Sequence, residues 1–125
     1  MWPCWYGAIH RFTTAPFASL RVCLRFPVNE IGAPFVITTG RRLRDEGWPQ
    51  GIDTLAIMLD GTCAFQSLPP QDIHIWWGGY VGMKEQILCA GPLAEVAEQI
   101  IKMRAAARAE HGWIMDIYVL RGAGV

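Results

Sequence analysis

Residues 91–120, GPLAEVAEQIIKMRAAARAEHGWIMDIYVL, decide the fold class because they contain a helix followed by a buried strand. Gly91 and Pro92 suit the N-cap and the first position of a helix, and Gly112 is typical of the residue that ends one. Between them, apolar residues recur at intervals of three and four, as on one face of a helix: Leu93, Val96, Ala97, Ile100, Met103 and Ala107. The pattern predicts one long helix over about 92–111.

The stretch that follows this helix, residues 113–120, is apolar at nearly every position. Asp116 is its only charged residue. Alternation of apolar and polar residues would indicate a strand with one wet face, whereas a continuous apolar run is typical of a strand that is buried on both faces. We therefore expect residues 113–120 to lie inside a sheet.

Most of the chain before the helix consists of short β-prone runs. The Asp60-Gly61 pair predicts a hairpin between residues 54–59 and 62–67, because Asp-Gly is the preferred pair of a two-residue type I′ turn. Gly78-Gly79 predicts a second hairpin whose return strand continues through Cys89. The polar stretch from Gly40 to Gly51 is expected to be a surface loop with one helical turn. Strands are expected at 5–12, 19–28, 34–39, 54–59, 62–67, 73–77, 80–89 and 113–120.

This excess of strands over helices predicts the architecture. One helix of about 20 residues is roughly 30 Å long and covers only part of one face of a sheet. We therefore expect an α+β fold: a mostly antiparallel, strongly curved or barrel-like sheet of about seven strands, with the helix at about 92–111 packed on it. A second copy of the chain is the other way to cover the free face, so we expect a homodimer. The whole chain, residues 1–125, is expected to form a single domain.

The composition excludes several classes of protein. Eleven Lys and Arg residues balance eleven Asp and Glu residues, so no overall charge favours nucleic acid or a membrane surface. No apolar run approaches the roughly 20 residues that cross a bilayer, and the N-terminus lacks a secretory pattern. The four cysteines form no C-x-x-C pair, which favours reduced thiols in a cytoplasmic protein. No motif indicates a metal, a nucleotide or another cofactor, and none is expected.

The densest aromatic cluster, residues 73–80, is the first candidate site. In a strand, His74 and Trp76 share one face, and Tyr80 follows after the glycine pair. These side chains combine apolar area with a polar group, which suits the wall of a ligand pocket. Packing in the core or at a dimer contact is the alternative, and it is the more frequent use of aromatic residues.

Asp116 is the second candidate, because a buried carboxylate costs several kcal/mol unless it is paired. With His74 it could form a general acid–base pair. The alternative is an ion pair with an arginine, for example Arg21 or Arg25. The candidate ligand-binding residues are therefore His74, Trp76, Tyr80 and Asp116.

The absence of a catalytic motif favours a non-catalytic module that binds a small apolar or aromatic molecule, or a partner protein, as a homodimer. Two alternatives remain open. One is a small cofactor-independent enzyme that uses His74 and Asp116 in an enclosed pocket. The other is an accessory protein of the immunity or antitoxin kind, whose function is its interface.

Substitution of His74 and Asp116 separates a structural role from a catalytic one. We expect both His74→Ala and Asp116→Asn to lower the melting temperature, because packing and ion pairing are the more frequent roles of such residues. Thermal unfolding of the two variants checks this. A melting temperature that stays the same or rises would indicate a strained catalytic site instead.

Overall fold

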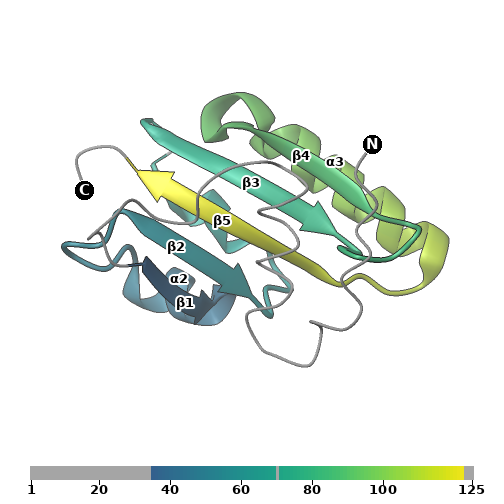
Figure 1. Ribbon diagram of the computed structural model, residues 1–125, viewed down its shortest axis with the longest axis horizontal. Coiled ribbons are helices and arrows are strands. Elements are labelled where there is room, and N and C mark those ends of the chain that lie inside the picture. Colours follow the sequence, from purple (N-terminus) through teal and green to yellow (C-terminus); the bar gives the residue numbers. More distant parts are fainter. Residues whose placement is uncertain (1–34, 70, 123–125) are drawn as a thin grey trace.

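The computed structural model describes residues 35–69 and 71–122 and shows one five-stranded sheet with two α-helices (Figure 1). The strand order is β1-β2-β5-β3-β4. β1 and β2 are parallel, and every other neighbouring pair is antiparallel. The elements are β1 (Phe35–Thr39), α2 (Gly40–Glu46), β2 (Thr54–Met58), the 3-10 helix η2 (Ala64–Ser67), β3 (Ile73–Gly79), β4 (Ile87–Pro92), α3 (Leu93–His111) and β5 (Asp116–Gly122).

Both helices and η2 pack on the same face of the sheet (Figure 1). Leu43 of α2, Phe65 of η2 and Ile100 of α3 are all buried in one cluster with side chains of the strands. The strand residues of this cluster alternate along each strand, as the pleat requires: Leu55, Ile57, Ile73, Ile75, Trp77, Tyr118 and Leu120.

The opposite face of the sheet is also apolar. Ala56, Ile117 and Val119 are buried there within the single chain. The expected two-sided burial is confirmed for residues 117–120, which are all buried in β5 between β2 and β3. It is wrong for residues 113–115, which precede the strand, and Trp113 and Met115 are exposed. The central side chains of this face are buried without a second copy of the chain, so covering the centre of the sheet does not require a dimer. The homodimer stays a prediction.

The expected architecture is wrong. The sheet is open and mixed, with five strands and two helices among the described residues, and it is not a curved or barrel-like sheet of about seven strands with one long helix. Two of the expected strands, 5–12 and 19–28, lie outside the described residues. The segment after Gly40, expected to be a loop with one helical turn, forms the seven-residue helix α2 and connects the parallel strands β1 and β2.

The hairpin expected at Asp60-Gly61 does not form, because the Asp60 side chain bonds to the backbone that follows it. Its carboxylate accepts hydrogen bonds from the amides of Thr62 (3.1 Å) and Ala64 (2.7 Å). Leu59 and Cys63 both have left-handed backbone angles, with φ of 53° and 54°. The chain therefore turns into η2 over the helix-covered face instead of returning as a strand beside β2.

The second hairpin forms as an antiparallel pair, but its turn and its register differ from the expectation, because residues 80–86 lie outside the strands. β3 and β4 are antiparallel, but Gly78 and Gly79 belong to β3 and pair with Leu88 and Ile87. They pair on their other side with Ile117 and Asp116 of β5. Main-chain hydrogen bonding on both edges holds the two glycines in the strand, so the connection moves to residues 80–86.

The long helix is confirmed. α3 runs from Leu93 to His111 and ends at Gly112, whose φ of 78° is left-handed. The Gly112 amide donates to the Arg108 carbonyl and closes the last turn, which is the role expected of a glycine at this position. At the other end, Gly91 and Pro92 still belong to β4. Neither helix of the described part has the length and apolar character needed to cross a membrane. The single domain over residues 1–125 stays a prediction.

Asp60 also joins the sheet to the helix layer. Its carboxylate accepts a hydrogen bond of 2.5 Å from the hydroxyl of Tyr118 on β5, and both side chains are buried. Burial raises the pKa of Tyr118, and the hydrogen bond and negative charge of Asp60 raise it further. Gly40, the first residue of α2, lies directly against the Asp60 carboxyl group, where a Cβ atom at position 40 would overlap it.

We expect Gly40→Ala to lower the free energy of unfolding by about 1–3 kcal/mol, because the added methyl group has to displace the buried Asp60 carboxyl group. Gly61→Ala is the matched control, since a Cβ atom there meets nothing within 4 Å. Urea unfolding of both variants measures the difference. Equal losses of stability at the two positions would contradict this packing.

Tyr118→Phe should lower stability at neutral pH by about 1–3 kcal/mol, because it removes a buried hydrogen bond to a carboxylate. The difference between wild type and variant should then shrink above about pH 10, where tyrosine in the unfolded chain loses its proton. The folded pKa of Tyr118 is raised, so the stabilisation is complete below the unfolded pKa and is lost as the pH rises. Urea unfolding between pH 8 and 11 tests this, and a constant difference would contradict it.

Candidate functional site

The candidate site lies at the edge of the sheet where β2 and β3 end and β5 begins. β1, β2 and β3 run in one direction, and β5 runs in the other. The ladder between β2 and β5 stops at the pair Ile57–Tyr118, whereas β5 stays paired with β3 as far as Asp116. β2 and β5 therefore lose their main-chain pairing at this edge.

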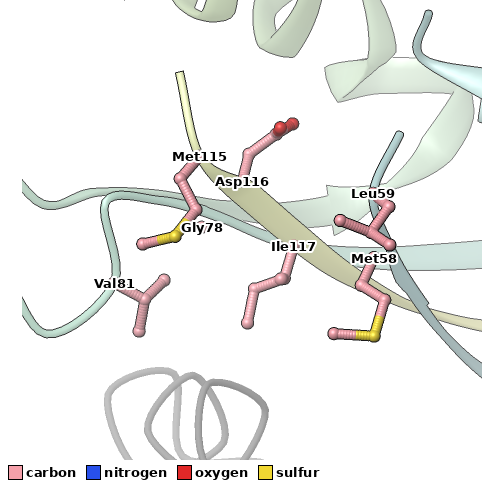
Figure 2. Close-up of a pocket in the computed structure, with 7 residues that line it drawn as sticks. All are labelled: Met58, Leu59, Gly78, Val81, Met115, Asp116 and Ile117. Carbon is pink, nitrogen blue, oxygen red and sulfur yellow. The ribbon is translucent and has the colours of Figure 1, made fainter. Parts of the chain in front are cut away.

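A pocket of about 160 Å³ opens at this place. Figure 2 shows the side chains of Met58, Val81 and Ile117 directed to the same side of the sheet. Leu59 and Met115 are 79% and 48% exposed, unusually open positions for apolar side chains of their size. The described residues that line the pocket are Met58, Leu59, Gly78, Val81, Met115, Asp116 and Ile117. A ligand would meet a mainly apolar surface.

The carboxylate of Asp116 points away from those apolar side chains, toward α3 (Figure 2). One of its oxygens accepts hydrogen bonds from Arg104 Nε at 3.0 Å and from Trp77 Nε1 at 2.9 Å. The Asp116 side chain is only 6% exposed. Asp116 is therefore the charged partner of an ion pair, as the structural alternative required, but the arginine is Arg104 of α3.

Arg104 also bonds to the end of β2. Its Nη2 donates to the backbone carbonyl of Asp60 at 3.1 Å. Burial alone would lower the pKa of Arg104, but the charge and hydrogen bond of Asp116 raise it on balance. The guanidinium thus stays charged in a buried position, where a single partner would leave several of its donors unsatisfied.

Tyr80, a predicted site residue, lies close to this edge and is fully buried. Its hydroxyl donates to the Trp113 carbonyl at 2.6 Å, and its amide donates to the Met115 carbonyl at 2.8 Å. Its ring makes edge contacts with His111 and Trp113. In this position Tyr80 anchors the segment between α3 and β5.

His74 and Trp76, the other two predicted site residues, lie toward the opposite end of β3. Their ring centroids are 4.3 Å apart, and the Arg121 guanidinium lies 5.2 Å from the Trp76 ring. Burial lowers the pKa of His74, and the charge of Arg121 lowers it further. In the β3–β5 ladder, His74 lies opposite Arg121 and Gly79 lies opposite Asp116. These two positions are five residues apart along β3, and at 3.3 Å per residue the separation is about 16 Å. The structure therefore does not bring His74 and Asp116 together as an acid–base pair.

Arg104 is the residue that the sequence interpretation missed. It lies four residues after Ile100 and three before Ala107, on the stripe of α3 that faces the core. A charged residue at such a position needs a buried partner of opposite charge. The position of Arg104 in the helical pattern could therefore have identified it as the partner of Asp116. Among residues 35–69 and 71–122, no group of three or more His, Cys, Asp or Glu side chains could hold a metal ion.

Comparison with known proteins gives two informative similarities. A precorrin-6A synthase (deacetylating) of Sinorhizobium sp is 50% identical over 97 residues, which are 78% of this chain and 37% of the relative. The crystal structure of a cobalamin synthesis related protein (CobF) from Corynebacterium diphtheriae superposes with a TM-score of 0.77 at 33% identity. That superposition covers 85% of this chain and 44% of the other. The chain thus spans less than half the length of either protein.

No family model matches the chain. A uroporphyrin-III C-methyltransferase of Thermus thermophilus reaches a TM-score of 0.49 at 17% identity and covers 82% of this chain and 47% of its own, which is too weak a likeness to support a conclusion. The similarity to a named synthase at 50% identity contradicts our hypothesis of a non-catalytic binding module. It does not test the expected homodimer. The chain is similar to an enzyme, the synthase of Sinorhizobium sp.

Proposed function

We propose that this chain is part of an enzyme of cobalamin biosynthesis, a precorrin-6A synthase of the deacetylating kind. The observation that carries the proposal is the 50% identity to such a synthase over 97 residues. The superposition on the CobF protein supports the proposal. That protein is described as related to cobalamin synthesis, and it shares the fold, at a TM-score of 0.77, with 33% sequence identity.

The pocket at the ends of β2 and β3 is the part of the chain that we assign to the ligand. An aligned stretch of 97 residues within this chain of 125 has to include Met58, Leu59, Gly78 and Val81. The similarity to the synthase therefore extends over one half of the pocket lining at least, and the match is not confined to a distant part of the fold.

The size of the pocket indicates how it is used. Pockets for small molecules commonly measure about 300–1,000 Å³, and this pocket measures about 160 Å³. A pocket of this size holds one edge of a ligand and not a whole precorrin. We therefore assign to these residues one wall of a larger site.

The chemistry of this wall is binding by apolar contact. Asp116 is the one ionisable side chain among the described residues that line it, and its carboxylate is engaged on the other side of the sheet by Arg104 and Trp77. The described lining thus offers the ligand apolar surface and backbone groups, and it orients the ligand without moving a proton.

Binding of precorrin-6A to the purified chain tests the proposal. We expect saturable binding by calorimetry, weakened at least about tenfold in Leu59→Asp and in Met115→Asp, since burying an apolar side chain contributes about 1.5–3 kcal/mol. Both positions are exposed in the free chain, so the substitutions should leave folding intact.

Phe35→Asp is the matched control, because Phe35 is also an exposed apolar residue but lies at the far end of β1, beside Thr54 and away from the pocket. Its affinity should equal that of the wild type. Absence of saturable binding to the folded wild-type chain, or an equal loss of affinity in the control, would contradict the proposal.

A further inference from the structure

We propose that Arg104 is a positioning residue that holds the two walls of the pocket at a fixed separation. The walls come from strands that are no longer paired: the β2–β5 ladder ends at Ile57–Tyr118, and the pocket residues Leu59 and Met115 lie beyond that point. Backbone hydrogen bonds between β2 and β5 therefore do not fix the distance between the walls at this edge.

The Arg104 side chain crosses this opening. Its Nη2 donates to the Asp60 carbonyl, at 3.1 Å, and its Nε donates to the Asp116 carboxylate, at 3.0 Å. Asp60 directly follows Leu59, and Asp116 lies between Met115 and Ile117. Each end of the bridge is thus one residue from a side chain that lines the pocket.

The bridge also includes the third strand of the site. Trp77 of β3 donates to the same oxygen of Asp116 at 2.9 Å, and the next residue, Gly78, lines the pocket. One planar guanidinium with donors in two directions can reach Asp60 and Asp116 together. A lysine ammonium, as a single point charge, can retain the bond to Asp116 but not both bonds in this geometry.

A second cavity supports the same role. About 190 Å³ of space is lined by Arg104 together with Leu59, Met115 and Asp116, three residues that also line the first pocket. Arg104 is 9% exposed. Removing its side chain would enlarge this space and leave the Asp116 charge without its cation, so the ends of β2 and β5 would be free to move apart.

Hydrogen exchange measured by mass spectrometry tests the proposal without any ligand. In Arg104→Met, we expect exchange in residues 58–61 and 113–117 to rise by about tenfold or more, as in a local opening. Exchange in the paired part of β3 and β4 should stay unchanged. Arg104→Lys should show a smaller rise in 113–117 than in 58–61, because it retains a bond to Asp116. If Arg104→Met does not fold, this lysine variant carries the test.

Arg108→Met is the matched control, one turn further along α3 and exposed, and it should exchange as the wild type does. A rise spread evenly over the whole sheet would show that Arg104 only stabilises the fold. Unchanged exchange in Arg104→Met would show that Arg104 does not fix the separation of the pocket walls. Either result overturns the proposal.

The identity of the ligand rests on the proposed function, and a second arm keeps the two apart. In folded Arg104→Met, we expect the affinity for precorrin-6A to fall by about tenfold or more, which corresponds to about 1.4 kcal/mol. If the wild-type chain does not bind precorrin-6A, the proposed function fails while the exchange data still decide the role of Arg104. If wild type and variant bind it equally, the role of Arg104 fails.

Discussion

The buried ion pair between Arg104 and Asp116 is the interaction on which the candidate site depends. Two charges in a protein interior cost free energy unless each finds its partner and its remaining hydrogen bonds. Here Asp116 accepts from Arg104 and Trp77, and Arg104 donates to both Asp116 and Asp60. The pair joins α3 to the ends of three strands, at the place where the pairing of the sheet stops.

A second buried carboxylate, Asp60, completes this layer of polar contacts. It holds the turn into η2 through backbone amides and receives the Tyr118 hydroxyl from the sheet. Its own carbonyl is the acceptor for Arg104. The polar groups therefore lie on the helix-covered face, and the apolar pocket lies on the other. Under the proposed function, the polar contacts on the helix-covered face fix the geometry of the pocket on the opposite face.

Patterns that are local in sequence predicted their structures correctly. The apolar period of three to four residues, together with Gly112, predicted α3, and the continuous apolar run predicted the central strand β5. Local signals failed where a side chain or a neighbouring strand competes for the backbone. Asp-Gly is a strong hairpin signal, but the Asp60 side chain bonds to the next amides instead. Gly78 and Gly79 stay in a strand because β5 and β4 bond to both of their edges. Residues 64–67, within the strand expected at 62–67, form η2 instead, and the sheet of the described residues is open, with five strands.

The same distinction applies to the site. Asp116 could be found because a carboxylate in an apolar strand requires a partner, and Arg104 could have been found on the buried stripe of α3. The pocket could not be predicted, because it depends on where the β2–β5 ladder stops. We propose that this edge binds one side of a precorrin while Arg104 holds its walls. An experimental structure of the chain in complex with precorrin-6A is the decisive test. We expect the ligand to lie against Met58 and Ile117, with Arg104 still bonded to Asp60 and Asp116. A ligand on the helix-covered face, or a pocket held in this shape with Arg104 turned away from both, would contradict it.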